Sequence, residues 1–267
     1  MAPNSPELIT HCNYVTYLLG ESTDLRINYQ KTLRYSSRVS TTNFRARINL
    51  IRLTHESIHE ELQKVNSNPE YARVCSAWIA IKSYYMLFCL ETILFSIITT
   101  QNKLGATHSE VRRFIRTSAL NGDLTSSPPT FLSTIRHSTC QRTGLRSGAN
   151  LSSQLSDSDR YKQVMKKLRE YALEEYKRVN GYRRMTAART LAFNNKTISL
   201  CDFFYWYRIK SNYRDLEFIA GNSAATSDLY NFYKNYAESA LNTARAYIDL
   251  INTLNAQRTN QTQLISF

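Results

Sequence analysis

The stretch Ser76–Ser96 reads SAWIAIKSYYMLFCLETILFS and carries only two charges, Lys82 and Glu91. Charges near the centre of a membrane span are costly, so the sequence favours a buried core helix over a bilayer crossing. A second run, Asp228–Leu254, places apolar residues at steps of three and four along its whole length, as an amphipathic helix requires. Such helices hide their apolar stripes by packing against other helices.

The composition of the chain also indicates a helical fold. The chain has 267 residues, of which 42% are hydrophobic, with only 7 Gly and 5 Pro. So few turn residues disfavour a sandwich or barrel of short strands, whereas the apolar fraction is sufficient for a sizeable core. We therefore predict an all-α protein, an antiparallel up-and-down bundle of four to five long helices.

The helical pattern predicts one bundle with an interruption. Residues 1–40 are polar with weak periodicity, and we expect an N-terminal extension there with a short helix near Ile9–Leu19. The bundle is expected over 41–256. Residues 121–158 are rich in Ser, Thr, Gly and Pro, which predicts a flexible insertion. Residues 257–267 are expected to form a C-terminal tail.

The cysteines and the N-terminal residues indicate in which cellular compartment the protein is expected. The 5 cysteines are odd in number and widely spaced, without a CxxC pair or a histidine at ligand spacing. Free thiols, no metal site and no cofactor are the simplest expectation. The beginning, MAPNSPELITHC, lacks the basic and apolar regions of a signal peptide, so we expect a cytoplasmic protein that does not enter a membrane.

Positive charge is concentrated in one third of the chain. The formal net charge is +13, and the segment Lys103–Arg189 holds 17 Lys and Arg against 7 Asp and Glu. Such a field attracts polyanions, RNA or another nucleic acid above all, although solubility or an acidic membrane face are alternative uses. The expected nucleic-acid-binding residues are Arg112, Arg113, Arg116, Lys162, Lys166, Lys167, Arg169, Arg183 and Arg184.

Four segments follow one another in an order that resembles a known family. They are SAWIAIKSYYMLFCLETILF (Ser76–Phe95), ATHSEVRRFI (Ala106–Ile115), WYRIKSNYRDLEFI (Trp206–Ile219) and AESALNTARAYIDLI (Ala237–Ile251). This succession is similar to that of the HEPN superfamily, the higher eukaryotes and prokaryotes nucleotide-binding domain. The similarity spans roughly Phe44–Leu254.

The resemblance implies a helical bundle that often dimerises, hence a homodimer or a complex with a protein partner. It also implies a setting in antiviral defence, toxin–antitoxin or RNA-processing systems, where many members are metal-independent endoribonucleases and others are non-catalytic. Catalytic members carry an arginine followed, after four to six residues, by a histidine. In that pair the arginine stabilises charge on the scissile phosphate, and the histidine acts as general acid or base.

The chain departs from this motif. Arg208 stands at the position of the family's arginine, with Asn212 and Tyr213 after it, and no histidine occurs beyond His137. Tyrosine is a poor proton shuttle near neutrality because its unperturbed pKa is about 10. The resemblance thus assigns catalysis to Arg208, Asn212 and Tyr213, while the missing histidine points to a degenerate ribonuclease.

Two other histidines offer alternatives. Arg52 and His59 have the family spacing but lie on an earlier segment, where the sequence favours the solvated polar face of an amphipathic helix over a second acid–base site. His108 is either catalytic or part of the loop before a helix capped by Thr107 or Ser109. The functional alternatives are therefore an RNA-directed ribonuclease or degenerate ribonuclease, a non-enzymatic module binding nucleic acid, nucleotide or protein, and a structural subunit.

Overall fold

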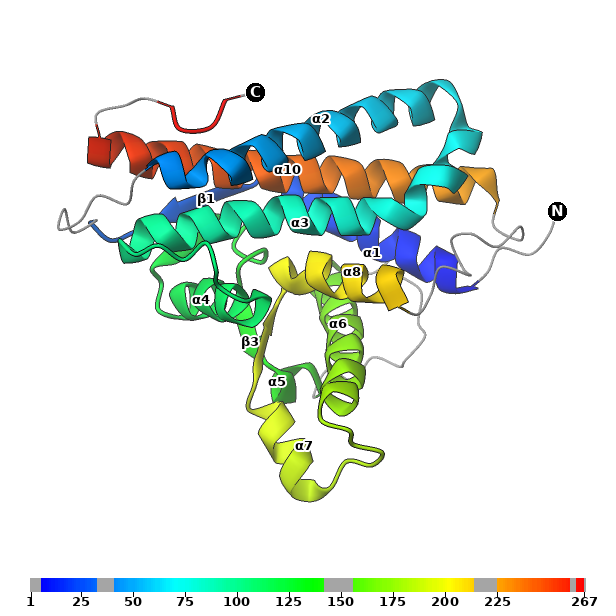
Figure 1. Ribbon diagram of the computed structural model, residues 1–267. Coiled ribbons are helices and arrows are strands. Elements are labelled where there is room, and N and C mark those ends of the chain that lie inside the picture. Colours follow the sequence, from blue (N-terminus) through cyan, green and yellow to red (C-terminus); the bar gives the residue numbers. More distant parts are fainter. Residues whose placement is uncertain (1–5, 33–40, 142–155, 214–224, 260–262, 267) are drawn as a thin grey trace.

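The computed structural model describes residues 6–32, 41–141, 156–213, 225–259 and 263–266. It confirms an all-α fold, to which two small two-stranded antiparallel sheets are added. Four long helices form the upper layer in Figure 1, where α2, α10 and α3 run side by side and α1 lies behind them. These helices are α1 (Pro6–Ser22), α2 (Arg45–Ser67), α3 (Ala72–Thr99) and α10 (Thr226–Thr259).

A second group of elements lies beneath α3 in Figure 1 and narrows to the tip at α7. The helix α8 lies against α3, while α6 descends steeply from the layer. The group comprises α4 (His108–Leu120), α5 (His137–Gln141), α6 (Asp157–Val179), α7 (Ala187–Asn194) and α8 (Phe203–Tyr213). Short 3-10 turns at Thr41–Phe44, Pro69–Tyr71 and Leu200–Asp202 precede α2, α3 and α8.

The core is centred on α3 and α10, as their apolar patterns predict. Leu229, Ala240 and Ile251 of α10 are completely buried, and burial of a leucine or isoleucine side chain stabilises the fold by about 1.5–3 kcal/mol. The two charges within Ser76–Ser96 are partnered. Lys82 Nζ lies 2.5 Å from Glu61 Oε1, and the Tyr247 hydroxyl donates to Glu91 Oε1 at 3.1 Å.

Helix α3 also meets the length and composition of a membrane span. Within the described residues, Pro69–Thr99 is the one helix that does so. Of its most apolar 18-residue window, 67% is buried inside the protein. A core helix of a soluble protein meets the same criteria, so this observation is weak evidence for a membrane.

The N-terminal segment differs from the predicted extension, because it belongs to the bundle. Leu8, Val15 and Leu18 of α1 are fully buried, and α1 packs along α10. The strand β1 (Arg26–Tyr29) then pairs with β2 (Leu124–Ser127). Residues 1–5 and 33–40 lie outside the described part.

The predicted insertion also differs from expectation over residues 122–141, which hold β2, β3 (Thr134–Arg136) and α5. The strand β3 pairs with β4 (Thr197–Ser199), and Phe131 between the strands is fully buried. Pairing with distant segments, which composition does not reveal, orders this stretch. Residues 142–155 of the insertion lie outside the described part.

The C-terminal tail is held against the last helix. Helix α10 continues to Thr259, beyond the predicted boundary. The side-chain oxygen of Asn252 accepts the backbone N–H groups of Leu264 and Ile265 at 3.0 Å each. Ile265 is buried, so these residues complete one end of the core.

We predict that Ala240→Asp destabilises the bundle by roughly 3–5 kcal/mol, because it buries a charge without a partner. Asn231→Asp introduces the same carboxylate at an exposed position of α10 and should change the free energy of unfolding by less than about 0.5 kcal/mol. Urea titrations of both variants, followed by circular dichroism, measure the difference. Equal stability of the two variants would contradict the packing described for α10.

Candidate functional site

A buried carboxylate joins α4 to the beginning of α8. Asp202 is 3% exposed, and its oxygens accept from Arg112 Nε at 2.9 Å and from an Arg116 terminal nitrogen at 3.0 and 3.2 Å. The backbone N–H of Ser199 also donates to it, at 3.0 Å. Burial by itself raises the pKa of Asp202, but the two guanidinium groups outweigh burial and lower that pKa to about 2. The carboxylate therefore stays charged.

In this ion cluster Arg112 and Arg116 bind a carboxylate of the protein itself. The sequence predicted that they bind nucleic acid. Their side chains are 13% and 18% exposed, and both are committed to Asp202. The Arg112 guanidinium also stacks on Tyr205, 3.7 Å from the ring centroid, and lies 4.9 Å from the centroid of Trp206. Both arginines are thus structural residues rather than a free phosphate-binding surface.

The guanidinium group of Arg208 is surrounded by aromatic side chains of α3 and α8. Its guanidinium carbon is 4.8 Å from the ring centroid of Tyr84, 5.6 Å from that of Tyr85 and 5.5 Å from that of Tyr205. One terminal nitrogen donates to the Tyr85 hydroxyl at 3.2 Å, whereas the buried Nε has no partner among the described residues. Arg208 is only 8% exposed, so its position is fixed.

His108 shares an aromatic neighbour with Arg208. It is the first residue of α4, directly after Thr107, whose side chain forms a capping box with Glu110. Its Nδ1 lies 2.6 Å from the Tyr84 hydroxyl, and its ring centroid is 4.2 Å from that of Phe88. Burial, followed by the positive charges of Arg208 and Arg112, lowers the pKa of His108. A half-buried, neutral imidazole therefore lies beside a fixed guanidinium.

The sequence did not predict that these two residues would lie together. Thr107 is the cap, one of the two expected, and His108 is the first residue of the helix and not part of the loop before it. Nothing local indicates that this helix start faces α3 and α8, because Tyr84 and His108 are joined only through tertiary contacts.

The other predicted catalytic residues belong to α8 and α2. Asn212 and Tyr213 belong to the last turn of α8, but their side chains lie outside the described part. Arg52 and His59 are exposed on α2, and Arg52 makes an ion pair with Glu56 at 3.6 Å. That arrangement matches the solvated polar face of an amphipathic helix.

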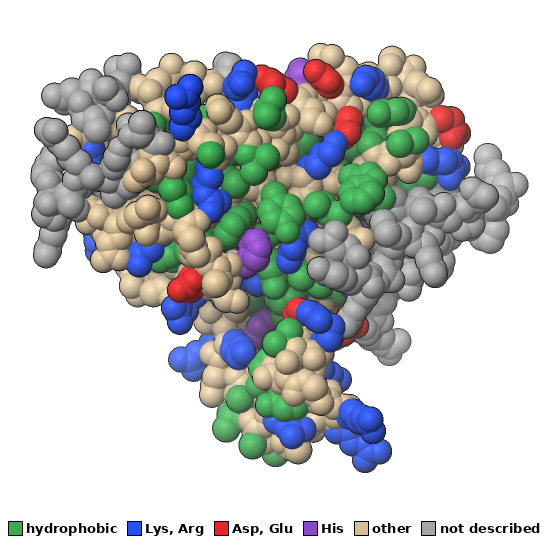
Figure 2. Space-filling view, in the orientation of Figure 1, with side chains coloured by type: hydrophobic (Ala, Val, Ile, Leu, Met, Phe, Trp, Pro, Cys, Tyr) green, Lys and Arg blue, Asp and Glu red, His purple; other side chains and the backbone are tan. Residues whose placement is uncertain are grey.

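The remaining predicted nucleic-acid contacts divide into two groups. Arg169 is structural, since its Nε donates to the His137 carbonyl at 3.0 Å and a terminal nitrogen donates to Asn194 at 3.1 Å. Lys162 and Lys167 pair with Asp159 and Glu170, and Lys166 is partly buried and has interactions of its own. The exposed residues of the predicted set that make no ion pair among the described residues are Arg113, Arg183 and Arg184. Figure 2 shows Lys and Arg spread over the narrow lower part of the molecule.

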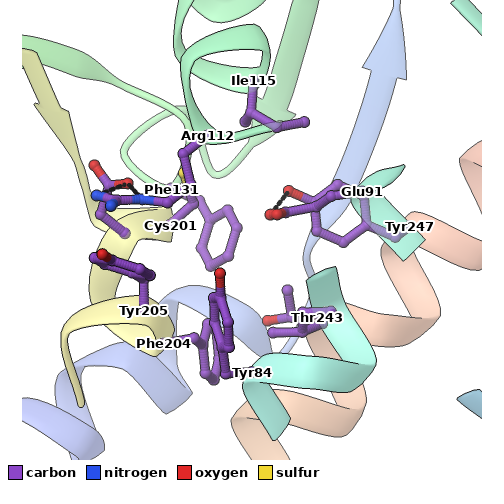
Figure 3. A pocket seen from close by; sticks show the side chains of 12 residues that line it. Tyr84, Glu91, Arg112, Ile115, Phe131, Cys201, Phe204, Tyr205, Thr243 and Tyr247 are labelled. Atoms are coloured by element: carbon purple, nitrogen blue, oxygen red, sulfur yellow. Dashed lines mark hydrogen bonds and ion pairs between the residues drawn. The ribbon is translucent and has the colours of Figure 1, made fainter. Parts of the chain in front are cut away.

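A small cavity of about 20 Å³ adjoins the Tyr84 side of this site. Figure 3 shows Tyr84 in its centre, Arg112 stacked on Tyr205 at one side, and Glu91 with Tyr247 at the other. The volume is sufficient for about one water molecule. Burial raises the pKa of Glu91 to about 7, although its hydrogen bond from Tyr247 opposes that rise.

No group of three His, Cys, Asp or Glu side chains suited to a metal ion occurs in the part of the chain that the structure describes. Comparisons of the chain with protein-family models, curated proteins and solved structures find no significant match. The likeness to HEPN proteins therefore rests on the four sequence segments alone.

We predict that Glu91→Gln changes how stability depends on pH. The folded-state pKa of about 7 lies above the ordinary 4.5, so the stability that protonated Glu91 contributes is full below about pH 4.5 and is lost as the pH rises through about 7. The loss amounts to roughly 2–3 kcal/mol in the wild type and is absent in the variant. Urea unfolding at about pH 5 and about pH 8 measures it.

Glu60→Gln is the matched control for this measurement because Glu60 is exposed on α2. The control should keep the wild-type dependence on pH. A Glu91→Gln protein that loses as much stability as the wild type between the two pH values would rule out Glu91 as the titrating group.

Proposed function

We propose that this chain is an RNA-directed protein of the HEPN type that cleaves single-stranded RNA without a metal ion, in a defence, toxin–antitoxin or RNA-processing setting. The observation that carries the proposal is the convergence of His108 and Arg208 on Tyr84. It supplies, from α4, the histidine that is missing after Arg208 in the sequence.

The chemistry of the two residues fits RNA cleavage in which a ribose 2′-hydroxyl attacks the adjacent phosphate. In the tautomer that carries its proton on Nδ1, His108 donates to the Tyr84 hydroxyl oxygen 2.6 Å away, which leaves Nε2 unprotonated and able to act as a base. Nε2 can take the proton of a ribose 2′-hydroxyl as that oxygen attacks the adjacent phosphorus, and the bond from phosphorus to the 5′-oxygen breaks as that oxygen takes a proton from water. The lowered pKa of His108 keeps the imidazole in this neutral form at physiological pH.

Arg208 would stabilise the negative charge that develops on the phosphate. Its contacts with Tyr84, Tyr85 and Tyr205 fix the guanidinium before substrate arrives. A preorganised donor of this kind contributes more to rate than a mobile surface arginine.

A homodimer or a complex with a protein partner is part of the same proposal. Large apolar side chains on α2 and α3 remain 48–63% exposed, which is typical of surfaces that bind other proteins. They are Leu50, Leu53, Val74 and Trp78.

We predict that His108→Ala and Arg208→Ala each lower the rate of RNA cleavage at least 100-fold, since general acid–base catalysis and charge stabilisation each contribute about that much. EDTA should have no effect on the wild type. Cleavage of labelled single-stranded RNAs by purified protein measures the rates, and circular dichroism verifies that each variant is folded.

Two further variants separate this site from its alternatives. His59→Ala removes the exposed histidine of α2 and should retain the wild-type rate. Tyr84→Phe keeps the ring but removes the contact to Nδ1 of His108, so the pH dependence of the rate should shift. If His59→Ala is inactive while His108→Ala is fully active, the proposed site is wrong. If the wild type binds RNA but cleaves none, the non-enzymatic binding module is the better account.

We predict that the combined change Arg113→Glu, Arg183→Glu and Arg184→Glu weakens RNA affinity more than tenfold and reduces its salt dependence, because fewer counterions are released on binding. The matched control reverses three exposed cations of α2, Arg45, Arg52 and Lys64, and should bind nearly as the wild type does. Fluorescence polarisation at several salt concentrations measures both. Equal losses in the two variants would show that only net charge matters.

A further inference from the structure

Besides the small cavity at Tyr84, the fold has a cavity of about 420 Å³ between α4, α6 and α8 and a groove of about 250 Å³ between β1 and α10. All residues of β1, Arg26–Tyr29, line the groove. Successive side chains of a strand point to opposite faces, so a groove lined by consecutive residues follows the edge of the strand. No residue of β2 lines it. The groove therefore lies along the edge of β1 that β2 leaves unpaired.

The ladder between β1 and β2 shows which backbone groups point toward this edge. The N–H of Gln30 donates to the carbonyl of Asp123 at 2.9 Å, one position beyond the register pair of Tyr29 and Leu124. Bonded and non-bonded pairs alternate in an antiparallel ladder, so the N–H and C=O groups of Ile27 and Tyr29 point away from β2. These outer groups form no backbone hydrogen bond with another described residue.

The groove has an apolar floor and charges of both signs on its rim. The buried residues of the floor are Ile27, Ala246, Leu250 and Leu254. Arg26 and Asp249 are exposed on the rim and make no ion pair among the described residues. Backbone donors and acceptors beside an apolar floor are what an extended peptide recognises when it adds to the edge of a sheet.

We propose that an extended segment of another polypeptide binds in this groove as a third strand beside β1. Its backbone exchanges hydrogen bonds with Ile27 and Tyr29, and every second side chain lies on the apolar floor. Its charged side chains pair with Arg26 and Asp249. The groove is lined neither by His108 and Arg208 nor by the exposed apolar residues of α2 and α3, so the inference does not depend on RNA cleavage or on those surfaces.

The experiment begins with an array of acetylated, amidated hexapeptides in which apolar residues alternate with polar residues of either charge. The full chain should bind a subset of them, and calorimetry gives the affinity of the best peptide. Backbone N-methylation at every second residue, in the set that faces β1, should weaken that peptide about tenfold or more, because it removes donors to the edge. N-methylation of the alternate set is the matched control and should leave binding nearly unchanged.

A pair of protein variants tests the same hydrogen bond from the other side. Tyr29→Pro removes an N–H that points away from β2, and proline is tolerated on edge strands, so the fold should persist while the peptide binds about tenfold more weakly. Tyr29→Val loses the same ring but keeps the N–H, and should bind more tightly than Tyr29→Pro. Arg26→Gln with Asp249→Asn should reduce the dependence of binding on salt. Circular dichroism verifies that each variant is folded.

Hydrogen exchange followed by NMR gives a direct readout. The Tyr29 amide should exchange rapidly in the free chain and slowly with peptide bound, whereas the Asn28 amide, which is bonded to β2, should be slow in both. Rapid exchange of Tyr29 in the complex would overturn the proposal. Slow exchange in the free chain would show that the chain itself already occupies the edge, which overturns it too.

Three other results would contradict strand addition. They are the absence of binding across the whole array, equal losses in Tyr29→Pro and Tyr29→Val, and equal losses from the two N-methylation patterns. A dimer of the wild type that Tyr29→Pro converts to a monomer would assign the edge to a second copy of this chain instead. His108→Ala should bind peptide as the wild type does, so loss of cleavage and loss of peptide binding can be distinguished.

Discussion

The arrangement beneath α3 depends on one buried carboxylate. Asp202 enters the interior because Arg112 and Arg116 neutralise it there, and the backbone of Ser199 completes its hydrogen bonds. Breaking such a cluster leaves uncompensated buried charge, which costs about 3–5 kcal/mol. The cluster fixes α4 against the beginning of α8, and hence fixes His108 at one end of α4 relative to Arg208 on α8.

The Arg112 side chain lies at the boundary between the two cavities beneath α3. One terminal nitrogen is tied to Asp202 at 2.8 Å, and the guanidinium plane covers Tyr205 and Trp206. The small cavity beside Tyr84 and the larger one beside Trp206 are both lined by this side chain. An arginine suits this use because it stays charged and its planar group stacks on aromatic rings.

The sequence predicted the long helices well where an apolar stripe repeats over many turns. The apolar stretch Ser76–Ser96 is contained in α3, and the run Asp228–Leu254 is contained in α10. The short helix expected near Ile9–Leu19 is present within α1, but its packing in the bundle and the strands were not predicted, since these are ordered by partners far away in the chain. Ile27 pairs with Ser126 in β2, and Ile198 of β4 pairs with Ile135.

By itself, the sequence determined the helical class, the core helices and the concentration of positive charge, because periodicity and composition are local properties. Only the tertiary structure decided what each charged residue does. Arg112 and Arg113 are neighbours in the chain, yet one is bound to a carboxylate 90 residues away and the other is exposed. The grouping of His108 with Arg208 was decided in the same way, because a side chain's neighbours depend on how helices pack and not on its position along one of them.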